Sequence, residues 1–364
     1  FAAVKVLFAP SSLSTGARMR AALFSEHGGP EVIRIAEAEV PEPAPGEVRV
    51  AVRAASLNHL DLWARRGLPF EIPMPHIGGS DVSGVVDALG PGVEEEGPGG
   101  VAIGTRVVVD PSLDYEWYRL PTRGPSIKDR PFRVLGEHTQ GGFAEYFVAP
   151  VDNLLEIPES VSFETAAAAP LTFVTAWHAL LGRGGLKPGE TVLVTGASGG
   201  VSTAAIQIAK LSGARVYALT SGAANVERAR ELGADVVYDR LEVNFSREVW
   251  RDTGKRGVDL ILDSVGEPLW EGCLRALAVG GRIVSYGGTG GPAVTSDVRV
   301  IFWKQLSILG TTMGPPEDFR RVMNLVFEGR LAPAIHEVMP LDDTRRAHEL
   351  LEAGEVFGKL VLIP

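Results

Sequence analysis

A strand, a glycine-rich turn and a helix follow one another in residues 190–210, and this run constrains the fold more than any other. Val192–Val194 form a short aliphatic run typical of a buried strand. Small residues occupy 196–200, and apolar residues then recur at spacings of three and four, which predicts an amphipathic helix. The run therefore predicts one strand–turn–helix unit of an α/β fold.

The turn in this unit has the chemistry of a phosphate-binding site. Only the middle glycine of the G-x-G-x-x-G pattern is kept, because its three positions hold Ala197, Gly199 and Ser202. A glycine lets a pyrophosphate approach backbone N–H groups, and the start of the helix offers free N–H groups and a positive dipole end. The alternative is a plain βα turn. The residues expected to contact a dinucleotide are Ala197, Ser198, Gly199, Gly200 and Val201.

The sequence after this helix continues the alternation of strands and helices. Residues 215–219 and 236–237 predict two further strands with a helix at 225–232 between them, which completes a βαβαβ unit. Strands expected at 260–263 and 282–286 run into small residues, and ligands bind at the carboxyl ends of parallel strands. This half is interpreted as a dinucleotide-binding domain. Its later strand ends carry further candidate cofactor contacts, Val265, Tyr286, Gly287 and Gly288.

The end of the second strand of this unit indicates which dinucleotide binds. NAD sites usually carry Asp or Glu there to hold the ribose hydroxyls, whereas this strand ends in Thr220 and Ser221. These hydroxyls could receive a 2′-phosphate, with charge supplied by Arg228 or Arg240; the alternative is that both arginines are solvated surface residues. The sequence favours NADPH, and NADH stays possible.

Composition excludes several other functions. The 364-residue chain has room for two domains, and its net charge of −10 argues against a nucleic-acid partner. No apolar run approaches the roughly 18 residues that cross a membrane. The only cysteine, Cys273, rules out an intramolecular disulfide and favours a reducing, cytoplasmic location. Residues 1–18 look foreign to the fold and are interpreted as a leader or tag-like extension.

Several further motifs carry a family resemblance. Short predicted strands separated by turn residues fill positions 20–150, ahead of the glycine turn. From Met19 to Pro364 the chain resembles the medium-chain dehydrogenase/reductase superfamily, and within it the quinone oxidoreductase branch. The resemblance rests on the order of these stretches: Gly28–Val32, Asn58–Asp61, Gly78–Gly84, Gly141–Tyr146, Ala169–Thr172, the glycine turn and Gly358–Val361.

The resemblance implies the architecture. We expect an α/β protein in which a Rossmann-type, doubly wound parallel sheet domain is joined to a mainly β, GroES-like barrel domain with flanking helices. The implied boundaries place the dinucleotide-binding domain at 156–308 and the catalytic domain at 19–155 and 309–364. An edge strand within residues 299–309 is expected to pair subunits into a homodimer or homotetramer.

Departures from the zinc-binding branch of the resembled family indicate that no metal binds. That branch has a cysteine where Asn58 stands, histidine and glutamate where Ser80 and Asp81 stand, and a cysteine near residues 172–173. These side chains do not form the nitrogen and sulfur set that zinc prefers, although Asp81 or His59 could contribute one ligand. The cysteines of the resembled family's structural zinc lobe are also missing from residues 111–137.

Without a metal, the cofactor and its placement must carry the chemistry. We expect hydride transfer from NADPH to a quinone or an α,β-unsaturated carbonyl, where the developing charge is delocalised. The catalytic candidates are Asn58, Asp61 and Thr172; the first two are equally interpretable as turn or structural residues. The resemblance places Thr172 and Val174 beside the nicotinamide. Two alternatives stay open: an alcohol dehydrogenase with atypical or absent zinc, and a non-catalytic NADPH-binding protein.

Overall fold

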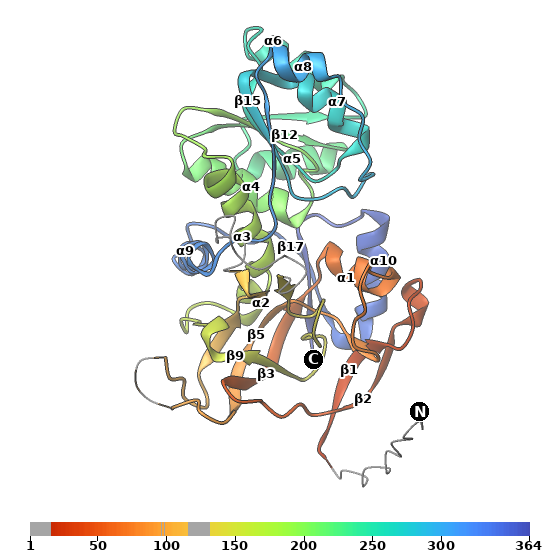
Figure 1. The fold of residues 1–364 in the computed structure, drawn as a ribbon, viewed down its shortest axis with the longest axis vertical. Helices are drawn as coiled ribbons and strands as arrows, with labels where there is room; N and C mark the ends of the chain where they lie inside the picture. Colours follow the sequence, from red (N-terminus) through yellow and green to blue (C-terminus); the bar gives the residue numbers. More distant parts are fainter. Residues whose placement is uncertain (1–15, 96, 98, 116–131) are drawn as a thin grey trace, which may run out of the picture.

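The computed structural model describes residues 16–95, 97, 99–115 and 132–364, and it consists of two lobes (Figure 1). The upper one, the parallel-sheet lobe, contains the glycine turn. The lower one, the antiparallel lobe, contains the start and the end of the described chain. Most of the predicted 1–18 extension therefore lies outside the described residues, and the first strand begins at Arg18.

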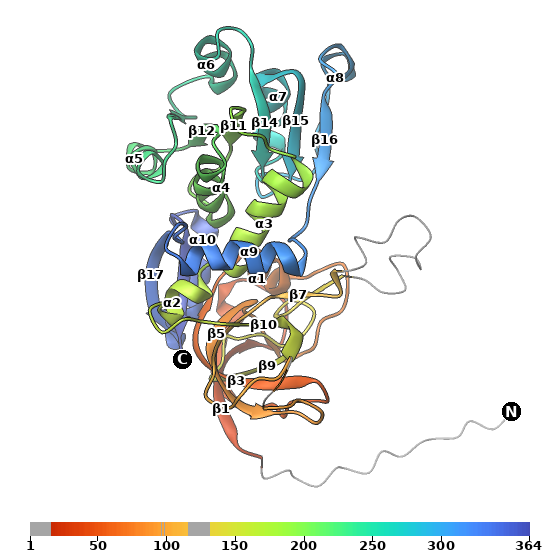
Figure 2. The same ribbon diagram turned by 90° about the vertical axis from the view of Figure 1, so that its left-hand side faces the viewer.

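A six-stranded parallel sheet forms the core of the parallel-sheet lobe, in the order β13-β12-β11-β14-β15-β16 (Figure 2). Its inner strands are buried on both faces, which explains their nearly continuous apolar sequences. The order reverses at β11, where Rossmann-type sheets open a crevice for a ligand. The strands are β11 (Thr191–Val194), β12 (Arg215–Thr220), β13 (Val236–Asp239), β14 (Val258–Asp263), β15 (Leu277–Ser285) and β16 (Ser307–Gly310).

Helices connect these strands and cover the sheet. The expected amphipathic helix after the glycine turn is α4, whose alanine- and isoleucine-rich face is fully buried. The edge strand expected within residues 299–309 is β16, and the short helix α8 precedes it. The helices are α4 (Gly200–Leu211), α5 (Ala223–Glu231), α6 (Phe245–Asp252), α7 (Glu267–Ala276) and α8 (Val298–Trp303).

The antiparallel lobe contains a seven-stranded and a three-stranded sheet. The larger runs β10-β6-β5-β3-β18-β17, with β9 also paired to β3, and the smaller runs β2-β1-β4. Within the described residues these pairings form no closed ring, so the barrel form of this mainly β lobe stays a prediction. The strands are β1 (Arg18–Phe24), β2 (Arg34–Glu39), β3 (Glu47–Ser56), β4 (His76–Ile77), β5 (Asp81–Leu89), β6 (Arg106–Val109), β9 (Tyr146–Pro150), β10 (Leu154–Glu156), β17 (Ile335–Pro340) and β18 (Lys359–Ile363).

Helical segments join the lobes in both directions. The chain crosses upward through α2 (Phe163–Ala167) and α3 (Pro170–Trp177), and α3 continues into a π-helical turn at His178–Arg183. It returns from β16 through α9 (Pro316–Phe327), which packs against α3 (Figure 2), and then through α10 (Thr344–Ala353). The last strand, β18, pairs with β3, so the C-terminal segment joins the sheet that β3 and β5 form. The predicted domain boundaries stay predictions.

Candidate cofactor and substrate site

The glycine turn leads from β11 into α4 and meets the C-terminal segment of the chain. The backbone N–H of Gly358 donates to the carbonyl of Ser198 at 2.7 Å, so β18 begins directly beside the turn. A Cβ at Gly200 would lie 2.9 Å from Lys359 Cδ and from Thr172 Cγ2. A residue with a side chain at position 200 would therefore displace both neighbours, which explains glycine there.

Ser202, which replaces the third glycine of the pattern, is integrated into the site. Its hydroxyl donates to the carbonyl of Thr195 at 2.8 Å and lies 2.8 Å from the hydroxyl of Tyr286. Burial raises the pKa of Tyr286 to about 12, so this phenol stays neutral. The serine is buried and connects α4 to β11 and to the end of β15.

A cavity of about 440 Å³, the inter-lobe cavity, opens between the turn and the antiparallel lobe. It contains nine of the residues predicted from sequence for the site. Thr175 also lines this cavity, one helical turn after Thr172, and the sequence reasoning did not identify it. The predicted residues on its wall are Asn58, Thr172, Ser198, Gly199, Gly200, Val201, Val265, Tyr286 and Gly287.

Three other predicted residues lie away from this cavity. Val174 is fully buried in the core against Gly314, because consecutive residues of α3 face different sides of the helix. Ala197 is likewise buried, beneath the turn. The carboxyl group of Asp61 accepts the backbone N–H groups of Asn58 at 2.7 Å and Gly79 at 2.9 Å. Burial raises its pKa to about 7, and its contacts are those of a structural acceptor.

The first residue of β18, Lys359, forms the polar centre of the site, and sequence reasoning did not single it out. Its ammonium group is buried and donates to the carbonyl of Leu57 at 2.6 Å, to Asn58 Oδ1 at 2.5 Å and to Asp81 Oδ2 at 3.2 Å. Burial lowers its pKa from the usual value, and Asp81 opposes that shift. A lysine inside the apolar closing strand is the sequence signal that could have identified it.

Asn58 is held in one orientation by this lysine. Because Oδ1 accepts from Lys359, the amide nitrogen Nδ2 faces Asp81 and donates to its Oδ2 at 2.9 Å. An amide nitrogen carries two hydrogens, so one N–H stays available beyond the Asp81 bond. Asn58 is also the N-cap residue of α1 (His59–Arg66), so its predicted structural role at a turn is compatible with its predicted catalytic role.

The group around Lys359 does not fit a zinc ion. An ammonium, an amide and a carboxylate already satisfy one another where the zinc-binding branch has its ligands, and an ammonium repels a cation. Leu171 N donates to Asp81 Oδ1 at 2.8 Å, and Ser80 is buried with an unpaired hydroxyl. Within the described residues, no three His, Cys, Asp or Glu side chains are grouped to hold a metal.

The expected adenosine end lies where β12 ends. Thr220 is buried, Ser221 is half-buried, and Arg240 is exposed. The guanidinium of Arg228 lies over the ring of Phe357 at 5.2 Å, next to Gly358. Sequence reasoning missed Asp239, which is the last residue of the neighbouring strand β13. Its carboxylate accepts the backbone N–H groups of Gly222 and Leu241 at 2.9 and 3.0 Å, so a negative charge lies at this turn.

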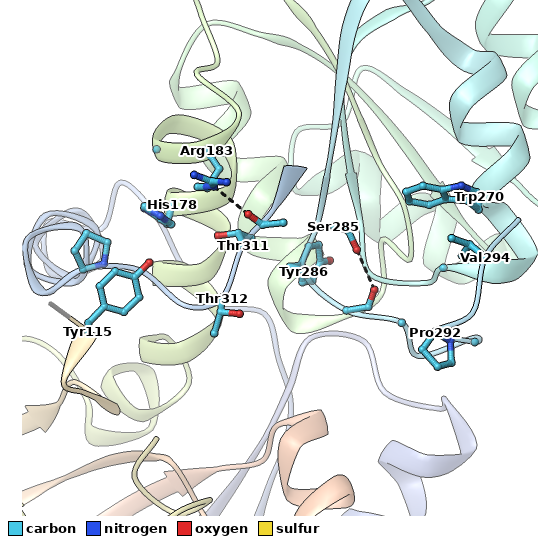
Figure 3. Close-up of a pocket in the computed structure, with 17 residues that line it drawn as sticks. Tyr115, His178, Arg183, Trp270, Ser285, Tyr286, Pro292, Val294, Thr311 and Thr312 are labelled. Atoms are coloured by element: carbon cyan, nitrogen blue, oxygen red, sulfur yellow. Dashed lines mark hydrogen bonds between the residues drawn. The ribbon is translucent and has the colours of Figure 1, made fainter. Parts of the chain in front are cut away.

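A second cavity of about 830 Å³, the outer cavity, has Tyr286, Thr311 and Trp270 on its wall (Figure 3). Tyr286, Gly287 and Thr312 border both cavities, and Gly288 borders only this one. His178 Nδ1 lies 2.8 Å from Asp318 Oδ2 on its wall. The two cavities thus share the loop that follows β15.

Comparisons with known proteins agree with this architecture. Residues 44–159 match the alcohol dehydrogenase GroES-like domain, and residues 200–328 match the zinc-binding dehydrogenase family. The quinone oxidoreductase of Salmonella typhimurium is 30% identical, over 94% of this chain and 98% of that protein. No helix of the described residues has the length and apolar character needed to cross a membrane.

Solved structures are similar over nearly the full length. An NAD-dependent alcohol dehydrogenase has a TM-score of 0.88 and 44% identity, covering 95% of this chain and 100% of that one. A cobalt- and zinc-bound thermostable alcohol dehydrogenase from Pyrobaculum aerophilum has a TM-score of 0.83 and 36% identity, covering 96% and 100%. The chain therefore belongs to the medium-chain dehydrogenase/reductase superfamily and is an NAD(P)H-dependent oxidoreductase that acts on a small molecule.

Proposed function

We propose that this protein is a zinc-independent reductase that uses NADPH to reduce a quinone or an α,β-unsaturated carbonyl compound. The observation that carries the proposal is the buried ammonium group of Lys359, bonded to Asn58 and Asp81 where related zinc enzymes place metal ligands. A positively charged group stabilises developing negative charge on an acceptor oxygen without a metal.

The residues around the inter-lobe cavity suit such a reaction. The free N–H groups at the start of α4 would hold the pyrophosphate, and Thr172 and Tyr286 would border the nicotinamide. Bound NADPH supplies the hydride. The second N–H of Asn58 would donate to the acceptor oxygen, with its orientation held by Lys359 and Asp81. The hydroxyl of Thr172 donates to the carbonyl of Ala169 at 3.2 Å, so Thr172 acts in this proposal through its position.

NADPH is proposed as the donor because β12 ends without a carboxylate, close to Arg228 and Arg240. Two observations favour NADH as the alternative. The carboxylate of Asp239 is bonded to Gly222, and a 2′-phosphate would be repelled by it. The similar structure with 44% identity is named an NAD-dependent enzyme.

An alcohol dehydrogenase activity is the second candidate, because a similar structure from Pyrobaculum aerophilum contains cobalt and zinc. Alcohol oxidation at a zinc site needs open coordination positions on the metal. The Lys359–Asp81 pair would have to separate to create a zinc site here. Metal analysis together with alcohol-dependent reduction of NAD(P) separates this candidate from the first.

The experiment that tests the proposal follows oxidation of NADPH and of NADH with a panel of quinones and enones after dialysis against a chelator. Activity that prefers NADPH and survives chelation is the expected result. Activity that disappears with the chelator and returns with zinc would support the alcohol dehydrogenase. Tight NADPH binding without turnover on any acceptor would support a non-catalytic protein.

A homodimer or homotetramer that pairs through β16 is the proposed assembly. β16 is an edge strand of the parallel sheet, and Ile308 on it is 44% exposed. Beside it, Phe302 and Trp303 on α8 are 56% and 76% exposed. An unpaired edge next to exposed apolar side chains is typical of a surface that another chain covers. The cytoplasmic location predicted from cysteine usage stays a prediction.

A further inference from the structure

Glu137 places a carboxyl group on the wall of the inter-lobe cavity. It follows β8 (Arg133–Val134), which pairs with β7 (Ser112–Leu113). Its side chain is 14% exposed, and it shares the cavity wall with Asn58 and Lys359. The carboxyl group is therefore shielded from bulk water and yet open to the space that the acceptor would occupy.

The backbone fixes where Glu137 lies. A Cβ at Gly136 would lie 2.5 Å from the carbonyl oxygen of Gly79, so the turn that carries Glu137 packs directly on the loop before β5. Gly136 has a φ of +75°, a conformation that suits glycine, and its carbonyl lies 3.0 Å from His76 Nε2. In the same loop, the backbone N–H of Gly79 donates to the carboxyl group of Asp61. Glu137 and Asp61 therefore both lie against this loop.

The two neighbouring carboxyl groups differ in the hydrogen bonds that they receive. Asp61 accepts two backbone N–H groups, and these stabilise its ionised form. Within the described residues, the only polar contact of the Glu137 carboxyl group is with His138 Nδ1, at 3.4 Å. That nitrogen already accepts the N–H of Val134 at 3.1 Å, so it offers Glu137 no proton. Burial raises the pKa of both groups to about 7, and the hydrogen bonds favour the protonated form at Glu137 more than at Asp61.

The other charged and titratable groups around Glu137 leave this assignment unchanged. Burial, followed by the charge of Asp61, raises the pKa of Glu137 to about 7. Burial lowers the pKa of His138 and of His76, so both rings are neutral at that pH. Lys359 and His59 line the same cavity, and the ammonium group of Lys359 is directed to Asn58 and Asp81.

We propose that Glu137 is the proton donor of the reduction. This inference rests on the proposed function, in which the acceptor takes up one hydride from the reduced nicotinamide and one proton. The electron pair of the acceptor's double bond moves to its oxygen as the hydride bond forms on carbon. The O–H bond of Glu137 then breaks, a new C–H or O–H bond forms on the acceptor, and water reprotonates the carboxylate.

A pH profile of the Glu137→Gln variant tests this role. Glu137 must be protonated to act, so the wild-type kcat is expected to fall as pH rises through about 7. In Glu137→Gln, kcat should fall about a hundredfold and that limb should disappear, while nucleotide affinity, measured by fluorescence titration, should stay unchanged. Glu137→Asp should keep the limb with an intermediate kcat. Glu156→Gln, at an exposed glutamate of β10, is the control and should match the wild type.

A second readout does not depend on turnover. Infrared difference spectra of the unliganded protein, recorded across a pH titration, should contain the carbonyl band of a protonated carboxyl group that is missing in Glu137→Gln. A band unchanged by the substitution would overturn the proposal, and so would a Glu137→Gln enzyme with wild-type kcat and its high-pH limb. Absence of activity in the wild type on every acceptor would instead overturn the proposed function, while the infrared titration would still report on Glu137.

Discussion

At the scale of single residues, a buried lysine organises the site. Lys359 places its charge against the carboxylate of Asp81 and fixes the orientation of the Asn58 amide. A buried charge that loses its partner is strongly destabilising, because the remaining ion is left without compensation in a medium of low polarity. In the proposed function Lys359 affects catalysis as well as stability, so the two effects need to be separated.

Lys359→Met keeps the length of the side chain and removes its charge. Asp81 would then be buried without its cation, so the free energy of unfolding should fall by about 3 kcal/mol in urea titrations. Activity should fall by about a hundredfold, because the charge near the acceptor oxygen is lost. The double variant Lys359→Met/Asp81→Leu should regain stability without regaining activity. Lys187→Met, at an exposed lysine, is the control; a double variant with full activity would contradict the role of Lys359.

Asp239 tests the choice of dinucleotide. Its carboxylate, bonded to Gly222 N, is expected to repel the 2′-phosphate of NADPH. Asp239→Asn should raise the ratio of kcat/KM for NADPH to that for NADH by about tenfold, which corresponds to about 1.4 kcal/mol. Glu242→Gln, an exposed neighbour that loses the same charge, should leave the ratio near the wild-type value. Equal ratios in the wild type and both variants would show that Asp239 does not affect the choice of dinucleotide.

At the scale of elements, strongly patterned segments were predictable and nonlocal contacts were not. The strand–turn–helix unit of β11 and α4 follows from a local pattern, as do the strands β12 and β13 and the helix α5 between them. The edge strand β16 was predicted within residues 299–309, but the helix α8 ahead of it was not, because its six residues are too few to show a helical period.

The same distinction applies to the site. The glycine turn is one continuous segment between β11 and α4, so its pattern was enough to indicate the turn, but not its backbone contact with Gly358. Lys359 and Asn58 are 301 positions apart and meet only because β18 pairs with β3. Glu137 and Asp61 come together through the contact between Gly136 and Gly79. No periodicity within one segment contains such information, so these residues could be found only in the folded chain.

Ser202 tests how the incomplete glycine pattern functions. Ser202→Gly restores the pattern, yet it removes the bonds to the carbonyl of Thr195 and to the hydroxyl of Tyr286. We expect the free energy of unfolding to fall by about 2 kcal/mol, from two lost hydrogen bonds and the added flexibility of glycine. Ser202→Ala removes the hydrogen bonds without adding the flexibility of glycine, so its free energy of unfolding should fall by less. Urea titration measures both variants, and a more stable Ser202→Gly would show that the hydroxyl does not hold α4 in place.

At the scale of the whole molecule, the site exists only where the two lobes meet. Gly358 donates to Ser198 across this junction, and the inter-lobe cavity takes its wall from both lobes. The last strand, β18, shares a sheet with β3, so the seven-stranded sheet of the antiparallel lobe is complete only after β18 has returned to β3. In the proposed assembly, subunits would pair along β16, which is one edge of the parallel sheet.

The proposed pairing through β16 predicts the effect of a charge on that edge. Ile308→Lys places an ammonium group on the strand, where a facing copy in a two-fold pair would bring a second one close to it. Light scattering coupled to size-exclusion chromatography should then report half the mass of the wild-type assembly. Ile103→Lys, at an isoleucine that is 56% exposed in the antiparallel lobe, is the matched control and should leave the mass unchanged. A wild-type monomer, or an Ile308→Lys variant that keeps the full mass, would show that β16 does not join the subunits.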